Sequence, residues 1–460
     1  AFAAVMSSVY NAAARGGPGA VMGRKNLKAI AINDPADRIQ VNDPKEFAST
    51  VEETRKALLD DTMADSYYDF GTAASIGPMN DMGTLPSLNF QKGSLDEVEE
   101  LTSQYWNREG LLKGRIGCSS CVYSCHRFIR IEDGPHKGTY SAGPEYETVS
   151  ALGSGPGINS IGTLHKSNEQ CNDLGLDTIS TGGVIQWLME TAEKGKLPEK
   201  WANSRYSFGN ERAVVELPRL IALRNDVGDL LADGTRQAAK EIGGETWKWA
   251  VQTRGLEQSR VETRGAMGYA LAFAMNPRGP DHLHTECLAE FGMTPEAEKI
   301  IEDITGDVKY ATPEITEKRA EIVRWHEDIY SVSDSLGLCA FTTTAAYGAT
   351  PGRCASLYRT LTGTPMNGEQ IMKAGRRTLT LERLINLELG WEEDPEEYAP
   401  WRLMNEEQED LNNPDPVLDR EKMTEMVKDY YQLHGWNTDT GVPREETLEE
   451  LGLDDLWRNR

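Results

Sequence analysis

The sequence predicts a mainly helical protein, and three observations favour that class over a sheet-based fold. Signals for helix starts and stops recur along the 460 residues, most clearly at Asn42-Asp43-Pro44, where Asp43 can cap a helix and Pro44 suits its first turn. Amphipathic runs lie on both sides of Thr253, whereas segments typical of strands are few and short. The length exceeds what one hydrophobic core usually fills, so more than one domain is expected.

The individual elements follow from local signals in chain order. Asp43 and Pro44 should start a helix that runs to about Leu59. Short strands are expected at residues 29–32 and 128–132, and the stretch 71–93, rich in Gly, Pro, Asn and Met, predicts an irregular segment that lines a site. Further helices are expected over the ranges 147–194 (with a break near 172–180), 217–239, 266–275, 295–304 and 313–330, and in the C-terminal tail.

Charge and cysteine content exclude several classes of function. A formal net charge of −25 argues against nucleic acid or an anionic membrane as a partner. No run approaches the roughly 18 apolar residues of a membrane span. Seven cysteines, an odd number with three close together, do not form the pattern of a disulfide framework, so a reducing compartment, the cytoplasm, is expected.

Three cysteines lie within eight residues, in Cys118-Ser-Ser-Cys121-Val-Tyr-Ser-Cys125. Neither the helical nor the strand period places this spacing on one face, so the backbone must loop around a common ligand. A Cys-x2-Cys-x3-Cys loop supplies three thiolates to a zinc ion or to an iron–sulfur cluster, with a fourth ligand from elsewhere. The best candidate for the fourth ligand is Cys339, while Cys171, Cys287 and Cys354 are expected in the core.

Two further loops share one pattern at distant positions. Asn172-x-x-Gly175-Leu176-Asp177 and Asp334-x-x-Gly337-Leu338-Cys339 each combine a polar side chain, a tight glycine turn and a second polar or thiol group. A duplicated loop is typical of a ligand with two similar halves, although so short a pair also arises by chance. Near the N-terminus, Arg15-Gly-Gly-Pro-Gly-Ala predicts either a phosphate-binding loop or a plain glycine-rich turn.

Together these stretches closely resemble the tungsten- and molybdenum-dependent aldehyde:ferredoxin oxidoreductase family. Besides the cysteine loop and the paired Gly-Leu loops, the resemblance rests on Arg15-Gly-Gly-x-Gly-Ala-Val-Met-Gly, Pro144-Glu-Tyr-Glu147 and Asn276-Pro-Arg-Gly-Pro-Asp-His282. The motifs keep the family's order and span almost the whole chain. This ordering favours an iron–sulfur cluster over zinc at the cysteines.

The resemblance implies a tungsten or molybdenum bis-molybdopterin beside a [4Fe–4S] cluster, with Mg²⁺ bridging the pterin phosphates as a further expectation. Glu147 and His282 match the family's acid/base pair near the metal, and are expected on opposite sides of a cofactor cleft between two domains. The implied cluster ligands are Cys118, Cys121, Cys125 and Cys339. The implied pterin contacts are Arg15, Gly16, Gly17, Ala20, Asn172, Gly175, Leu176, Asp177, Asp334, Gly337 and Leu338. The structural alternatives are a Glu147 that caps a helix and a His282 that is a hydrogen-bonded core residue.

The predicted division is a remnant of the β-rich pterin-binding domain at 1–40, a helical domain at 41–250 with the cysteine loop and the first pterin loop, and a helical domain at 251–460 with the second pterin loop and Cys339. Three features depart from the family. Most of the first domain should precede Ala1, Asn172 replaces the usual aspartate, and His284 stands where some members carry a basic residue. The Glu-x2-His pair that binds an interfacial metal in one branch is not seen near Lys166, so that branch's dimer does not follow.

The expected function is oxidation of an aldehyde to a carboxylic acid, with electrons passing through the cluster to ferredoxin or to an iron–sulfur partner subunit in an oligomer or multi-subunit complex. A second reading within the family is the catalytic subunit of a tungsten-dependent aryl-CoA reductase of the benzoyl-CoA type, with an aryl-CoA substrate. A third is a non-catalytic iron–sulfur subunit. The sequence does not choose between tungsten and molybdenum, because the pterin sulfurs hold the metal.

Overall fold

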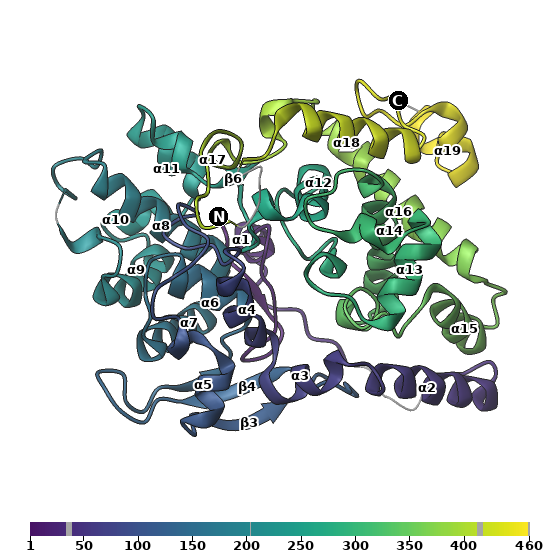
Figure 1. The fold of residues 1–460 in the computed structure, drawn as a ribbon, viewed down its shortest axis with the longest axis horizontal. Coiled ribbons are helices and arrows are strands. Elements are labelled where there is room, and N and C mark those ends of the chain that lie inside the picture. Colours follow the sequence, from purple (N-terminus) through teal and green to yellow (C-terminus); the bar gives the residue numbers. More distant parts are fainter. Residues whose placement is uncertain (34–38, 203, 412–416, 459–460) are drawn as a thin grey trace.

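Helices form two lobes that lie side by side in the computed structural model, which describes residues 1–33, 39–202, 204–411 and 417–458 (Figure 1). The predicted mainly helical class is confirmed. Within the described ranges the strands form small antiparallel sheets: β1 (Val5–Met6) with β2 (Ala12–Ala13), then β3 (Leu112–Ile116), β4 (His126–Arg130) and β5 (Tyr140–Ala142), then β6 (Gln252–Thr253) with β7 (Leu256–Glu257). No helix in these ranges is long and apolar enough to cross a lipid bilayer.

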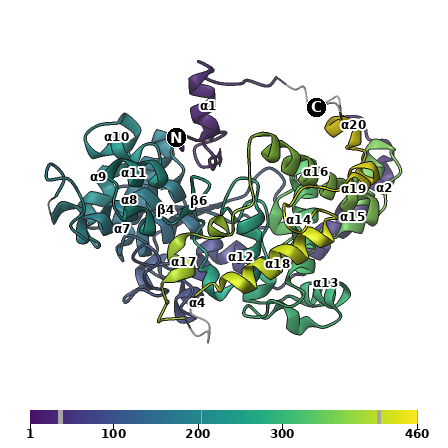
Figure 2. The same cartoon turned by 90° about the horizontal axis from the view of Figure 1, so that it is seen from above.

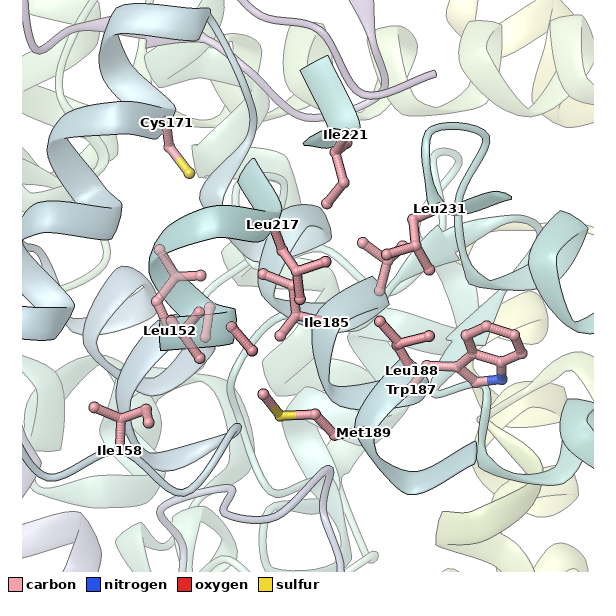
Figure 3. Packing of buried hydrophobic residues seen from close by; sticks show 14 of the residues in the cluster. Leu152, Ile158, Cys171, Ile185, Trp187, Leu188, Met189, Leu217, Ile221 and Leu231 are labelled. Atoms are coloured by element: carbon pink, nitrogen blue, oxygen red, sulfur yellow. The ribbon is translucent and has the colours of Figure 1, made fainter. Parts of the chain in front are cut away.

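The first lobe, on the left of Figure 1, is built around a helix that is buried on all sides. This helix, α8, buries apolar side chains such as Trp187 and Leu188 together with the polar Gln186 and Glu190. Figure 3 shows its Trp187 and Leu188 near Leu217 and Leu231, with Cys171 at the edge of the same cluster. The lobe comprises α4 (Ile76–Asp81), α5 (Ser103–Arg108), α6 (Tyr146–Val149), α7 (Ile161–Leu174), α8 (Thr178–Glu193), α9 (Glu211–Leu223), α10 (Val227–Leu231) and α11 (Thr235–Ile242).

Helix α2 (Pro44–Leu59) begins and ends where the capping signal predicts. The side chain of Asp43 accepts a hydrogen bond from the amide of Glu46 at 2.9 Å, which satisfies one of the free amides of the first turn. Although α2 precedes the first lobe in sequence, it packs against α15 of the second lobe, where Arg359 pairs with Glu46. The short helix α3 (Met63–Phe70) then returns the chain to the first lobe.

The second lobe is organised around α14 and α16, which pack closely along their length. The approach is tight because Gly375 of α16 faces α14: a Cβ there would lie 2.1 Å from the carbonyl oxygen of Asp328. The lobe comprises α12 (Met267–Met275), α13 (Pro295–Thr305), α14 (Arg319–Leu336), α15 (Pro351–Thr362), α16 (Gly368–Glu388), α18 (Arg420–Leu433), α19 (Glu445–Leu451) and α20 (Asp454–Arg458).

Helix α17 (Trp401–Asn405) crosses back to the first lobe. Its Arg402 donates to the Glu190 carboxylate of α8 and to the carbonyl of Asn89 (2.7 Å), and both charged side chains are buried. Together with α2, this contact shows that each lobe takes elements from both predicted helical domains. The predicted domain boundary at residue 250 stays a prediction. The two lobes do not coincide with it, because α2 and α17 each pack against the other lobe.

The N-terminal segment carries α1 (Pro18–Arg24), which stands apart from both lobes when seen from above (Figure 2). Residues 27–33 beyond it form no strand, and Ile30 and Ile32 are 71% and 86% exposed. The strand predicted at 29–32 is therefore wrong, because no neighbouring strand in the described chain offers it hydrogen bonds or apolar cover. The strand predicted at 128–132 is confirmed as β4, shifted two residues towards the N-terminus.

Candidate functional site

The three clustered cysteines lie on the loop that joins β3 to β4. Ser120 and Ser124 have φ angles of 60° and 48°, and this left-handed conformation curls the loop on itself. The amide of Cys121 donates to the carbonyl of Cys118 at 3.0 Å, and the amide of Tyr123 donates to the Cys121 sulfur at 3.4 Å. The Cys118 side chain itself is exposed.

Cys339 reaches the same place from the second lobe, just after the C-terminal end of α14. Phe341, two residues after Cys339, packs in the same apolar cluster as Cys121 and Cys125. Cys339 itself is exposed, as Cys118 is. In the parts of the chain that the structure describes, no three Cys, His, Asp or Glu side chains converge closely enough to hold one metal ion.

The two Gly-Leu loops have the same backbone geometry, because both end a helix. Gly175 after α7 has φ 65° and ψ 45°, and Gly337 after α14 has φ 70° and ψ 27°. In each turn the leucine amide reaches back to the carbonyl five residues earlier, at 2.9 Å for Leu176 and 2.8 Å for Leu338. This is the Schellman arrangement, in which a left-handed glycine closes the helix. Helix termination therefore explains the glycine and leucine of each loop without a ligand.

The polar side chains of these loops differ in surroundings. The Asn172 carbonyl accepts from the Gly175 amide at 3.3 Å, but the Asn172 side chain forms no hydrogen bond with another described residue. Together with Leu176, Asn172 lines a cavity of about 170 Å³. Asp177 lines it too, but it also caps α8, accepting from the amides of residues 179 and 180 at 3.1 and 3.3 Å. Asp334 is exposed, and partial desolvation raises the pKa of its carboxyl while His284 opposes the rise. Asn172 and Asp334 are thus the side chains of the two loops whose structural roles are least explained.

Arg15 is buried and links the two halves of the site. Its guanidinium lies 3.5 Å from the Asp177 carboxylate and 3.3 Å from that of Asp281, and it donates to Ser259 Oγ at 2.8 Å. It also donates to the backbone carbonyl of Glu257. With the carbonyl of Pro280 at 3.3 Å, two carboxylates, a hydroxyl and two carbonyls surround the Arg15 guanidinium, which the sequence assigns to phosphate.

The glycine-rich run beside Arg15 packs closely against the start of the chain. Gly17 begins α1 with φ 71°, and a Cβ there would lie 2.0 Å from the carbonyl oxygen of Ala1, so only glycine fits. Gly16 is exposed and also left-handed, with φ 82°. Ala20 lines a cavity of about 320 Å³ with Leu176, which brings the run next to the first Gly-Leu loop.

Glu147 of α6 and His282, which follows α12, meet between the lobes: Glu147 Oε1 lies 3.5 Å from His282 Nδ1. Each side chain is 15% exposed. The second carboxylate oxygen of Glu147 accepts from the amide of Arg260 at 2.8 Å, so Glu147 caps no helix. The pair is in direct contact, whereas the sequence analysis expected the residues across a cleft. Chain order indicates the lobe of each residue but not the distance between their side chains.

Two residues that the sequence analysis did not single out complete this site. Ser259 Oγ lies 2.9 Å from His282 Nδ1 and accepts from the His282 amide at 3.2 Å and from Arg15. Glu286 is buried four residues after His282, and burial raises its pKa to about 7. No local pattern marks Ser259, whereas Glu286 stood in the polar run that begins at Asp281 and could have been found there.

The segment 71–93, predicted to be irregular, contacts the start of the helix that carries Glu147. The Thr72 hydroxyl donates to the Glu145 carboxylate at 2.5 Å and accepts from the amide of Tyr146 at 2.9 Å, which holds the start of α6. His126, directly after the cysteine loop, lies 3.1 Å from the other oxygen of Glu145. The cysteine loop and the Glu147 helix are thereby tied to one another.

Known proteins resemble this chain along almost its whole length. The family model described as aldehyde ferredoxin oxidoreductase, domains 2 and 3, matches residues 49–453, and that of the N-terminal domain of the same family matches residues 1–34. The chain is 32% identical to the tungsten-containing aldehyde ferredoxin oxidoreductases of Thermococcus kodakarensis and Pyrococcus furiosus, over 98% and 99% of this chain and 71% and 72% of those proteins.

More distant relatives differ in their described reactions. The WOR-like subunit of an aliphatic sulfonate oxidoreductase from Pyrococcus furiosus is 27% identical over 99% of this chain and 69% of that protein. Among solved structures, the active site complex BamBC of benzoyl coenzyme A reductase with 1,5-dienoyl-CoA contains a chain with the same fold. Its TM-score is 0.75 at 21% identity, covering all of this chain and 72% of that one. From the two family models and the close relatives, the chain belongs to the aldehyde ferredoxin oxidoreductase family.

Proposed function

We propose that this chain oxidises an aldehyde to a carboxylic acid with a tungsten bis-pterin group, molybdenum being the alternative metal, and passes the electrons through a [4Fe–4S] cluster to ferredoxin. The observation that carries the proposal is the contact between Glu147 and His282, a half-buried acid and base between the lobes. The names of the relatives support the substrate class and the metal. Seven free cysteines suit the reducing, cytoplasmic setting in which such a cluster is kept.

The residues present fit the proposed groups. Cys118, Cys121, Cys125 and Cys339 would hold the cluster as thiolates, whose mutual repulsion the iron would offset. Asn172 and Asp334 would face the pterins, because neither is used by the fold in the way that Asp177 is. When bound, the metal–pterin group supplies the two-electron acceptor. Mg²⁺ would take its ligands from the pterin phosphates, since the described side chains form no acidic cluster that could bind it.

The protein groups can handle the protons of this reaction. Oxidation of an aldehyde by water gives a carboxylic acid, two protons and two electrons. Ser259 Oγ accepts from Arg15 and from the His282 amide, so its own hydroxyl proton is free to point at His282 Nδ1. With a proton on Nε2, His282 would donate towards a substrate oxygen. Glu147, held by the Arg260 amide, is then the base that accepts a proton from the attacking water.

The proposal is tested with Glu147→Gln and His282→Asn. Each should lower aldehyde-dependent reduction of a viologen dye by about 10²–10⁴-fold, the span for lost acid–base catalysis, with unchanged tungsten, pterin and iron content. His284→Asn is the matched control, because His284 pairs with a different glutamate, Glu382, at 2.9 Å. Near-normal turnover in a fully loaded Glu147 or His282 variant would contradict the assignment.

The other readings give different results in the same experiments. Reduction of an aryl-CoA thioester by the dithionite-reduced protein, without aldehyde oxidation, would identify the aryl-CoA reductase of the family. Iron without tungsten, molybdenum or pterin in the native protein would identify a non-catalytic iron–sulfur subunit. Size-exclusion chromatography with light scattering tests the expected oligomer or complex with an electron-accepting subunit.

A further inference from the structure

Arg127 is a buried cation in direct contact with the cysteine loop. It lies on β4, two residues after Cys125, and it is 3% exposed. Its guanidinium donates to the backbone carbonyls of Ser124 at 2.9 Å, His126 at 3.0 Å, Tyr68 at 2.8 Å and Tyr67. Because Ser124 belongs to the cysteine loop, the first of these hydrogen bonds ties the guanidinium to the loop itself.

A glycine makes room for this contact. Gly71 follows α3 and has a φ of 65°. A Cβ at Gly71 would lie 2.6 Å from the carbonyl oxygen of Cys125 and 3.4 Å from Cζ of Arg127. The end of α3, the last cysteine of the loop and the guanidinium therefore meet at a point where no residue larger than glycine fits.

No carboxylate neutralises the buried charge of Arg127. Carbonyl oxygens satisfy the hydrogen-bonding groups of a guanidinium but carry no charge, and a buried charge without a counter-charge is costly. Among the buried arginines of the described chain, only Arg127 and Arg260 form no ion pair, and Arg260 donates through its amide to Glu147 at the candidate site. The others each contact a carboxylate: Arg15, Arg264, Arg319, Arg383 and Arg402.

The acidic neighbour of Arg127 is already engaged, and one donor of Arg127 is left over. Glu145 is the carboxylate that interacts most with the Arg127 charge, but it forms no ion pair with it. The oxygens of Glu145 are bound by the Thr72 hydroxyl at 2.5 Å and by His126 at 3.1 Å. The Nε atom of Arg127 is buried and has no hydrogen-bond partner among the described residues. A buried donor of this kind calls for an explanation, and an anionic group at the cysteines would supply one.

Arg115 shows how the same sheet holds an arginine whose charge is satisfied. It lies directly opposite Arg127 in the register of β3 and β4, and it donates to the same carbonyl, that of Tyr68, at 3.0 Å. In contrast to Arg127, its side chain is 31% exposed and pairs with Asp69 at 3.4 Å. The Arg115 charge is therefore both hydrated and paired, whereas that of Arg127 is neither.

Thiolates that bind a metal centre bring negative charge to the loop, and each electron added to the centre increases it. A buried cation beside the centre stabilises the reduced form more than the oxidised form. We propose that Arg127 is a positioning residue whose buried charge compensates that of the centre held by the cysteine loop and favours its reduction. One electron enters and one leaves, and the guanidinium keeps its proton throughout. The inference rests on the proposed function, because it takes this centre to be the [4Fe–4S] cluster.

The test measures the reduction potential of the cluster in the purified holoenzyme, by redox titration followed with electron paramagnetic resonance. Arg127→Met removes the charge and should make reduction less favourable by about 10–100-fold in equilibrium constant, at about 59 mV for each tenfold step. Arg127→Lys keeps the charge and loses the planar fork, so its equilibrium constant should stay within about threefold of the wild type. Arg115→Met is the matched control and should also stay within about threefold, because its charge is paired and hydrated.

The Lys variant keeps the inference testable if Arg127→Met binds no iron. Iron at the wild-type potential in Arg127→Lys then supports the role of the charge. An Arg127→Lys protein that also lacks iron, or whose potential falls by the amount expected for Arg127→Met, would assign the effect to the hydrogen bonds of the fork and overturn the inference.

The outcomes also separate the inference from the proposed function. An unchanged potential in Arg127→Met, an equal shift in Arg115→Met, or a native protein without iron would each overturn the inference. An unchanged potential in Arg127→Met, in a protein that oxidises aldehydes, would leave the proposed function standing. A protein that oxidises no aldehyde, yet shows the expected shift in Arg127→Met, would refute the proposed function and support the role of Arg127.

Discussion

Replacing Arg15 by Met tests whether the site is held together by a buried cation. Arg15 lies between the carboxylates of Asp177 and Asp281, which come from the first and second lobes and are almost fully buried. Methionine fills a similar volume but cannot neutralise either carboxylate, so both would remain buried with one positive partner fewer.

The magnitude follows from Asp281. Burial alone would raise the pKa of this carboxyl, but Arg15, with Arg278 and His282, lowers it from 3.8 to about 2. At about 1.4 kcal/mol per pKa unit, the shift contributes about 2 kcal/mol to stability. The contact with Asp177 adds to this, so we expect a loss of about 3–5 kcal/mol, as for other broken buried pairs. The Asp281 share is present above about pH 4 and is lost as the pH falls through about 2, because the folded-state pKa is the lower one.

The assay is urea denaturation at pH 7, followed by tryptophan fluorescence. Arg24→Met, an exposed arginine on the neighbouring helix, is the control and should leave the midpoint unchanged. Adding Asp281→Asn to Arg15→Met should recover part of the loss, because the orphaned charge is then removed. If Arg15→Met stays within about 1 kcal/mol of the wild type but loses pterin, the electrostatic reasoning fails and the phosphate role predicted from sequence is favoured.

Three further predictions test the cluster, the core and a buried acid. Cys339→Ser should lower iron content and the signal of the reduced cluster, and Cys354→Ser, in the core, should not; full iron retention in the first variant would remove Cys339 from the ligands. Gly182→Ala should cost about 1–3 kcal/mol in urea denaturation, since its Cβ would lie 2.2 Å from a carbonyl oxygen, whereas Gly23→Ala, in open space, should cost nothing. Because burial raises the pKa of Glu327 to about 8 from 4.5, wild-type stability should fall as the pH rises between these values, and Glu327→Gln should flatten that slope; an identical slope in the variant would refute the burial argument.

Helix ends could be predicted from the sequence where residues within the first turn determine them. Helix α2 was placed at its observed ends because Asp43 and Pro44 determine its start within one turn. Helix α14 begins six residues later than the predicted Pro313, because Lys318 adopts a left-handed conformation with φ 60°. That turn lets Arg319 donate to the carbonyl of Ile315 at 2.9 Å. The hydrophobic periodicity of the sequence does not predict this contact.

In the candidate site, too, residues within a local motif could be predicted, whereas residues brought together by packing could not. The cysteine loop carries its own signature, whereas Cys339 stays a prediction from the Gly-Leu-Cys pattern. Ser259 escaped notice because its importance comes from Arg15 and His282, which lie far from it in sequence. Distances between lobes are likewise set by packing, which is why the contact between Glu147 and His282 could not be predicted.

The paired Gly-Leu loops show how a repeat in sequence can mislead about its cause. Both turns are Schellman motifs with matching hydrogen bonds, so any helix that ends in this way would produce the same glycine and leucine. The information about a ligand must therefore lie in the residues that the turn does not require. Asn172 and Asp334 are such residues, and their surroundings differ, since Asn172 lines a cavity and Asp334 is exposed. Two similar backbones with unlike polar groups would hold two similar halves of one ligand unequally, and the half at Asp334 would be the one whose binding responds to pH.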